Sequence, residues 1–168
     1  MALGQYNSFF KNHFHEVELE NYTIFSAGTI ISASSSGANN PQILIRNPSS
    51  SGKSLLFLLI AGNADIQNSH TTFGAFSTPT VTANGTTLNS YTRTIGSGAT
   101  AVALLTTLPT ISSNGNLLSY SKSGENTDMQ NIIEPYTLLI PENNAVLITA
   151  KPKDNGRDQV YKLIWIER

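Results

Sequence analysis

The fold is decided by four short segments of alternating character in the middle of the chain: Thr71-Thr-Phe-Gly-Ala-Phe76, Thr80-Val-Thr-Ala83, Ser90-Tyr-Thr-Arg-Thr-Ile95 and Ala99-Thr-Ala-Val-Ala-Leu-Leu105. Thr and Val are β-branched, so they are accommodated better on a pleated strand than in a helix. Turn signals separate or follow these segments, at Asn84-Gly85, Gly96-Ser-Gly98 and Asn114-Gly115. Gly and Asn tolerate the positive φ of tight turns. The pattern predicts consecutive short strands.

The same spacing continues on both sides of this region. Further strands are expected at Tyr22–Phe25, Thr29–Ala33, Gln42–Arg46, Ser54–Ala61, Asn116–Ser121, Tyr136–Ile140, Ala145–Lys151 and Gln159–Glu167. No long helix is predicted, because no segment of helical length repeats apolar residues with the helical period. A short helix is compatible with Gln5–Glu20, and a single helical turn with Asp128–Ile133. About ten short strands with Gly and Asn turns predict an all-β fold, an antiparallel β-sandwich or jelly roll.

The 168 residues fit a single domain. We expect a short N-terminal arm over residues 1–20 and a β-sandwich, jelly-roll-like domain over residues 21–168. The run Ser54–Ile60 is apolar on both faces, which predicts a central strand covered on each side. We expect a hairpin loop to join this strand to Gln42–Arg46. Trp165 shares a strand face with Tyr161 and is expected to anchor either the core or a subunit interface.

Charge is scarce in this chain. Charged residues make up 12% of the sequence, the net charge is −1, and Arg93 is the only charged residue between Asp65 and Lys122. Nucleic acid is therefore not an expected partner, because proteins that neutralise phosphates carry clustered Lys and Arg. Cysteine is absent, which excludes disulfides, thiol catalysis and cysteinyl zinc sites. No membrane partner is expected either, since the most apolar run, Leu55–Gly62, is too short to span a bilayer.

Two motifs suggest ligands, and neither predicts a site. The segment Asn47–Ser54 ends in Gly-Lys-Ser, but a phosphate-binding loop begins with Gly and opens a helix, whereas a strand is expected here. His13 and His15 lie on one side of an extended segment and would bind a metal with Glu18 or a symmetry mate. A third ligand at suitable spacing is missing from the chain. No metal and no cofactor are therefore expected.

Enzymatic activity is not expected. The carboxylates Asp65, Glu134 and Glu142 lie beside turn residues, which favours solvated loop ends over the fixed pair that glycoside hydrolysis needs. A Gly-x-Ser-x-Gly elbow is absent. The charge-poor region also offers four aromatic residues as a sugar-binding platform, although core filling and sheet-surface packing are the favoured roles: Phe73, Phe76, Tyr91 and Tyr120.

Two parts of the sequence resemble a family. The run Ile43-Leu-Ile-Arg-Asn-Pro-Ser-Ser-Ser-Gly-Lys-Ser-Leu-Leu-Phe57 resembles the hairpin of small tailed-bacteriophage virion proteins, in which Asn-Pro, a Ser/Gly loop and Lys join two apolar strands. The closing strands, Tyr136–Pro141, Ala145–Thr149 and Val160–Glu167, are similar to those of the same group. The resemblance covers about residues 40–167. Such proteins are β-sandwiches that commonly assemble as trimers, and several decorate or cement capsids.

The resemblance implies a non-enzymatic virion structural protein, made in the host cytoplasm and placed on the capsid surface. Its partners would be its own copies, as a homotrimer, and the major capsid protein. A surface rich in Ser, Thr and Asn suits this role, because each buried charge would need a partner. The alternatives are a tail or fibre module that binds host-surface glycans, and a hydrolase with an unrecognised carboxylate pair.

The N-terminal arm carries more aromatic residues than a disordered tail should. The interface candidates are Tyr6, Phe9, Phe10 and Phe14 in the arm, and Trp165 near the C-terminus. We expect the arm to order on a neighbouring subunit or on the shell.

Deletion of residues 1–20 is therefore expected to lower the occupancy of the protein on capsids, because the arm's aromatic contacts would be lost. Quantitative gel analysis of purified particles measures this occupancy. Unchanged occupancy would discard the arm hypothesis.

Overall fold

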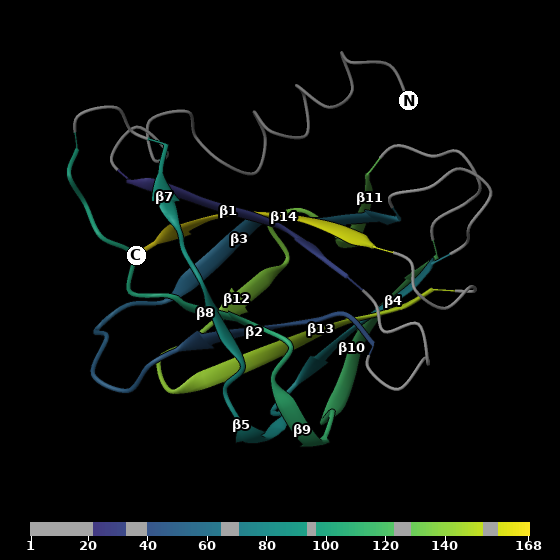
Figure 1. Ribbon diagram of the computed structural model, residues 1–168. Helices are drawn as coiled ribbons and strands as arrows, with labels where there is room; N and C mark the ends of the chain where they lie inside the picture. Colours follow the sequence, from purple (N-terminus) through teal and green to yellow (C-terminus); the bar gives the residue numbers. More distant parts are fainter. Residues whose placement is uncertain (1–21, 33–39, 65–70, 94–96, 123–128, 153–157) are drawn as a thin grey trace.

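The computed structural model describes residues 22–32, 40–64, 71–93, 97–122, 129–152 and 158–168. These residues form two facing antiparallel sheets and a separate two-stranded ribbon, and they contain no helix (Figure 1). The predicted all-β class and the antiparallel sandwich are confirmed. Successive strands mostly alternate between the two sheets, as they do in jelly rolls, and the assignment to that particular topology stays a prediction.

The first sheet, sheet A, has the order β11-β3-β14-β1-β7, and β12 also pairs with β3. Its strands are β1 (Ile24–Ile31), β3 (Leu55–Ala64), β7 (Tyr91–Thr92), β11 (Gln130–Ile133), β12 (Leu138–Ile140) and β14 (Gln159–Glu167). The second sheet, sheet B, has the order β10-β4-β13-β2-β8-β6. Its strands are β2 (Gln42–Asn47), β4 (Thr71–Ser77), β6 (Thr86–Leu88), β8 (Leu104–Thr107), β10 (Asn116–Lys122) and β13 (Asn144–Pro152).

Trp165 lies at the centre of the core between the sheets. Its ring is fully buried and stacks on Phe25 and Phe57, with ring centroids 5.8 and 5.6 Å apart. Phe73 and Tyr161 are also buried in the core and meet edge to face. The core role expected for Trp165 is confirmed. Its candidacy as an interface residue is wrong, because the indole has no surface left for a neighbour.

The expected hairpin between Gln42–Arg46 and Ser54–Ala61 is also wrong. β2 belongs to sheet B and β3 to sheet A, so the loop between them crosses from one sheet to the other. The buried Asn47 holds this crossing, since its Nδ2 donates to the carbonyls of Lys53 (2.7 Å) and Ile140 (3.0 Å). Both strands are buried on two faces and pair on both edges, which leaves no edge for them to share. The expected strand after the loop is confirmed.

Several element boundaries differ from the sequence prediction. The strands expected at Tyr22–Phe25 and Thr29–Ala33 meet in one strand, β1, which runs from Ile24 to Ile31 and passes straight through Gly28. A helical turn was expected at Asp128–Ile133, but Gln130–Ile133 form strand β11. Ile132 and Ile133 are buried, and β11 pairs with β3.

Residues 99–103 were expected to be strand, but the strand β8 begins only at Leu104. Here a side chain replaces a neighbouring strand. The buried carboxylate of Glu167 accepts hydrogen bonds from the backbone N–H of Val102 (2.9 Å) and Ala103 (3.1 Å), and from Nε1 of Trp165 (3.1 Å). Charge-assisted bonds of this kind stabilise an extended segment without a sheet partner.

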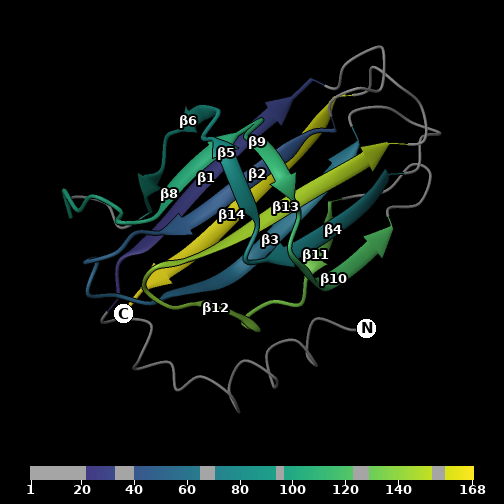
Figure 2. The same ribbon diagram turned by 90° about the horizontal axis from the view of Figure 1, so that it is seen from below.

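The ribbon consists of β5 (Thr80–Ala83) and β9 (Thr110–Ser113), and it crosses the outer face of sheet B (Figure 2). Val81 and Ile111 pair with each other and are half-buried, whereas the other ribbon residues are exposed. These two side chains therefore face the sheet. The ribbon explains why Leu44 and Leu147, whose side chains point out of the sandwich core, are nevertheless fully buried.

The ribbon strands belong to a repeat. Ser77-Thr-Pro-Thr-Val-Thr-Ala-Asn-Gly-Thr-Thr-Leu88 recurs thirty positions later as Thr107-Leu-Pro-Thr-Ile-Ser-Ser-Asn-Gly-Asn-Leu-Leu118. The contacts repeat as well. Thr78 and Leu108 both have positive φ, and the hydroxyl of Thr82 donates to the carbonyl of Thr110 just as Ser112 donates to Thr80.

The strand pairings extend this repeat into a pseudo-twofold axis. β6 pairs with β8 in the register Thr86↔Thr107, and β10 pairs with β4 in the equivalent register Asn116↔Ser77. The axis passes between β2 and β13, where Leu44 and Leu147 are opposite each other. Each arm thus leaves one side of sheet B, crosses its outer face and pairs with the other side.

Substitution of Gly115 tests the crossing. Gly115 has φ +87°, and a Cβ there would overlap the carbonyls of Ser77 and Thr78. Gly115→Ala is expected to lower the free energy of unfolding by about 3 kcal/mol, from left-handed strain plus overlap. Gly52→Ala is the control, because Gly52 has φ +64° with open space around it. That variant should lose only about 1 kcal/mol in urea unfolding. Equal losses would contradict the proposed packing.

Candidate functional site

Two pockets flank the ribbon, one beside each of its strands. The β9 pocket measures about 330 Å³ and is lined by Asn40, Gln42, Leu108, Pro109, Thr110, Ile111 and Asn114. The β5 pocket measures about 370 Å³ and is lined by Arg46, Asn47, Pro48, Ser49, Thr78, Pro79, Leu104, Asn143, Asn144 and Ala145. The pseudo-twofold axis relates the two pockets, since Leu108-Pro109 and Thr78-Pro79 occupy equivalent positions. The molecule therefore carries two versions of one site.

The backbone around the β9 pocket is fixed from several directions. The carbonyl of Pro41 accepts hydrogen bonds from the N–H of Ala150 (2.9 Å) and from Oη of Tyr161 (3.0 Å). The N–H of Leu108 donates to the carbonyl of Gln42 (3.0 Å) and so joins the start of the β9 arm to β2. Burial raises the pKa of the Tyr161 phenol far above its ordinary value, so it remains a donor.

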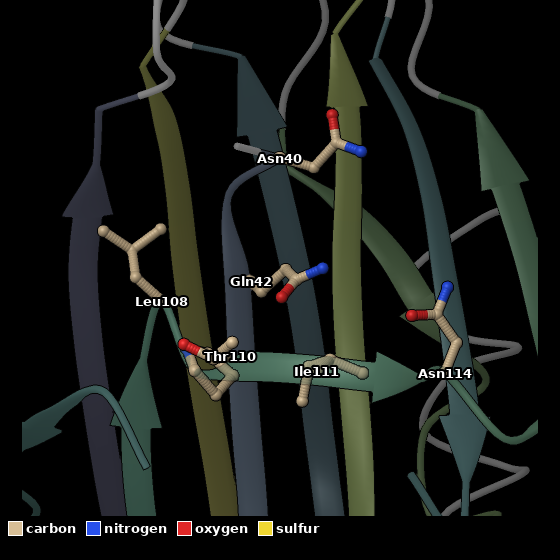
Figure 3. A pocket seen from close by; sticks show the side chains of 7 residues that line it. Asn40, Gln42, Leu108, Thr110, Ile111 and Asn114 are labelled. Carbon is tan, nitrogen blue, oxygen red and sulfur yellow. The ribbon is translucent and has the colours of Figure 1, made fainter. Parts of the chain in front are cut away.

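The β9 pocket is rich in carboxamides. Asn40, Gln42 and Asn114 surround the open space beside β9 (Figure 3). Their side chains make no hydrogen bond within the part of the chain that the structure describes. The apolar part of the wall comes from Leu108, Pro109 and Ile111. No ionisable side chain is among the described residues that line the pocket, so this wall is uncharged.

The β5 pocket has the same origin, but internal bonds hold two of its polar side chains. Nη1 of Arg46 donates to Oδ1 of Asn84 at 2.8 Å, and Nδ2 of Asn144 donates to the carbonyl of Glu142 at 2.8 Å. The pseudo-twofold axis places Thr149 at the position equivalent to Arg46, and Asn114 at that of Asn84. Because Thr149 is short and uncharged, no arginine holds Asn114.

Most residues considered from the sequence do not assemble into a site. Tyr6, Phe9, Phe10 and Phe14, the histidines at 13 and 15, and Asp65 lie outside the described residues.

The aromatic platform does not form. Phe73 fills the core, as favoured, while Tyr91 and Tyr120 are exposed on opposite edges of the sandwich, on β7 and β10.

The carboxylate of Glu142 accepts a hydrogen bond from the backbone N–H of Ser50. Glu134 is exposed, and its backbone carbonyl, not its carboxylate, accepts a bond from Oγ1 of Thr137 (2.6 Å). Over the described residues, no group of three or more His, Cys, Asp or Glu side chains is placed to hold a metal ion. The same part of the chain has no helix long and apolar enough to cross a membrane.

The sequence interpretation missed the pocket residues. Asn40, Gln42 and Asn114 are common residue types in an Asn-rich chain, and nothing local marks them. The signal that was present is the repeat Pro-Thr-x-x-x-Asn-Gly at Pro79 and Pro109. A repeat indicates equivalent local structures, and its differences indicate where those structures have diverged.

Comparison of the chain with protein families, with curated proteins and with solved structures finds no match. The class of protein that the fold and the site define is an antiparallel β-sandwich with a crossing ribbon and a carboxamide-lined pocket beside β9.

The Tyr161 hydroxyl gives a test of how the pocket is held. Tyr161→Phe is expected to lower the free energy of unfolding by about 1 kcal/mol at pH 7, through loss of its bond to Pro41. Above pH 10 Tyr161 ionises in the unfolded chain but not in the folded protein. The free energy of unfolding of the wild type therefore falls by about 1.4 kcal/mol per pH unit relative to that of the variant. The difference should therefore vanish near about pH 11.

Urea unfolding over this pH range measures the effect. Tyr120→Phe is the control, because Tyr120 is exposed, and it should match the wild type throughout. If the difference in unfolding free energy between the wild type and Tyr161→Phe stayed constant with pH, the buried and hydrogen-bonded state of the Tyr161 hydroxyl would be contradicted.

Proposed function

We propose that this protein is a non-enzymatic structural component of a bacteriophage virion, a homotrimer that decorates or cements the capsid surface. The proposal draws on the resemblance of residues 40–167 to small virion proteins. It also draws on the character of the exposed surface, which suits contact between proteins more than the binding of a charged partner.

The observation that carries the proposal is the edge strand β10. It lies at one edge of sheet B, beside β4. Its residues Leu117, Leu118 and Tyr120 are 58%, 48% and 68% exposed. Natural proteins usually protect such an edge with charges, bulges or a cover. Of these devices β10 has the bulge, between Leu117 and Ser119. Its one charged residue is Lys122 at the end, so no charge lies beside its exposed apolar side chains. Clustered exposed apolar side chains mark contact surfaces.

The surface of this edge is also poor in charge. β10 contributes Asn116, Ser119 and Ser121 beside its apolar residues, so packing of the edge against a neighbour would bury hydroxyls and amides rather than charges. Burial of charge is costly unless each charge is paired. A trimer on a capsid would also engage several weak contacts together, which raises avidity without any one contact being tight.

A second candidate is a tail or fibre module that recognises host-surface glycans. One observation favours it, the uncharged carboxamide pocket beside β9.

Leu118→Glu tests the assembly role. The wild type is expected to sediment as a trimer and to bind capsids that lack it. In the variant a charge would be buried without a partner, so trimer formation and capsid occupancy should fall at least about tenfold. Analytical ultracentrifugation and electron microscopy of reconstituted particles measure the two quantities.

Leu139→Glu is the matched control, because Leu139 is 44% exposed but lies on β12 of the other sheet. It should assemble like the wild type. A monomeric wild type, or equal loss in both variants, would overturn the proposal.

A further inference from the structure

We propose that the β9 pocket binds a neutral saccharide, through the carboxamides of Asn40, Gln42 and Asn114. This inference does not depend on the assembly role, because the pocket lies on the outer face of sheet B and none of its lining residues belongs to β10.

The polar groups of the pocket fit sugar hydroxyls. A carboxamide offers two N–H donors and a carbonyl acceptor, and each hydroxyl of a sugar both donates and accepts. One carboxamide can therefore bond two adjacent hydroxyls at once. Three such groups, with the hydroxyl of Thr110, surround the space drawn in Figure 3. They have no hydrogen-bond partner within the described residues, so a ligand would not have to break protein bonds.

The apolar part of the pocket fits the other face of a sugar ring. Leu108, Pro109 and Ile111 line it, and they would cover C–H groups while the carboxamides bond the hydroxyls. A volume of about 330 Å³ lies within the size range of small-molecule pockets.

Charge selects the class of ligand. Over the part of the chain that the structure describes, no lysine, arginine, histidine or carboxylate lines the pocket. An anionic or cationic ligand would lose its hydration there without gaining an opposite charge, which is costly. Neutral hexoses lose only hydroxyl hydration, which the carboxamides replace. The pocket is thus suited to an uncharged polyol.

The β5 pocket serves as an internal comparison. It derives from the same repeat, but Arg46 is bonded to Asn84 and Asn144 to the carbonyl of Glu142. Thr149 on β13 takes the position equivalent to Arg46, and Asn114 is free within the described chain. Arg46 and Asn144 in one copy thus bond within the protein, whereas the carboxamides of the other copy are available to a ligand.

The pocket is also held in shape before any ligand arrives. The bonds from Ala150 and Tyr161 to Pro41, and from Leu108 to Gln42, fix both walls. A site fixed in this way does not have to order backbone upon binding, which improves affinity.

A glycan microarray with the full chain tests the proposal. The array carries neutral glucose-, galactose- and mannose-terminated oligosaccharides beside sialylated and sulfated ones. We expect binding to one or more neutral saccharides and none that requires the acidic groups. For the best neutral saccharide, Gln42→Ala and Asn114→Ala should each raise the Kd, measured by calorimetry, about tenfold. Competition by the free monosaccharide distinguishes recognition of a terminal sugar from recognition of a polymer.

Asn84→Ala is the matched control, since Asn84 is the repeat equivalent of Asn114 and does not line the β9 pocket. It should leave the Kd unchanged. Absence of binding to every neutral saccharide, or an unchanged Kd in the double variant Gln42→Ala/Asn114→Ala with a normal unfolding curve, would overturn the proposal. Capsid occupancy of the same double variant should equal that of the wild type, so the two proposals fail separately.

Discussion

The pairing of Leu44 on β2 with Leu147 on β13 is the constraint on which sheet B depends. Both side chains are fully buried although they point away from the sandwich core. A strand pair that is apolar on both faces needs a second cover, and no helix supplies one within the described residues. The ribbon of β5 and β9 is that cover. To reach it, the chain must leave sheet B at Thr78 and Leu108, and both residues take the positive φ that the sharp exit requires.

The pseudo-twofold symmetry explains how one chain produces both a structural site and an available one. Two equivalent arms cross two equivalent strands, so any pocket that forms beside one arm forms beside the other. Substitution on only one side then separates their roles. Arg46 binds the carboxamide of Asn84 in one copy, while Thr149 at the equivalent position leaves Asn114 without such a partner. The difference between two related positions is therefore more informative than either position alone.

The sequence contained enough information for the class of fold but not for its connections. Alternation and β-branched residues predict strands at β4 and β5, because the period of two is a local property. The partner of a strand is not local. The loop at Asn47–Lys53 looks like a hairpin, since nothing in it reveals that β2 and β3 each pair on both edges with other strands. Residues 99–103 look like a strand because they alternate, but the N–H groups of Val102 and Ala103 bond the distant Glu167 instead of a neighbouring strand. The pocket is equally hidden, because Asn40 and Asn114 are far apart in the chain. The repeat was visible, and aligning it would have paired Asn84 with Asn114.

Assembly and recognition of a saccharide place compatible demands on this molecule. A pocket of carboxamides without an aromatic platform binds a sugar weakly, because hydrogen bonds to a solvated ligand exchange against bonds to water. A single copy would hold such a ligand only briefly. A homotrimer would present three pockets at fixed separations, and a capsid carrying many trimers would present more, so that simultaneous contacts raise the avidity for a saccharide-coated surface well above the affinity of one site. Weak individual recognition is then an advantage, since contact with a single free sugar does not occupy the surface. The two demands fall on different surfaces, because packing would use the edge strand β10 and the β9 pocket lies beside the ribbon on the outer face of sheet B.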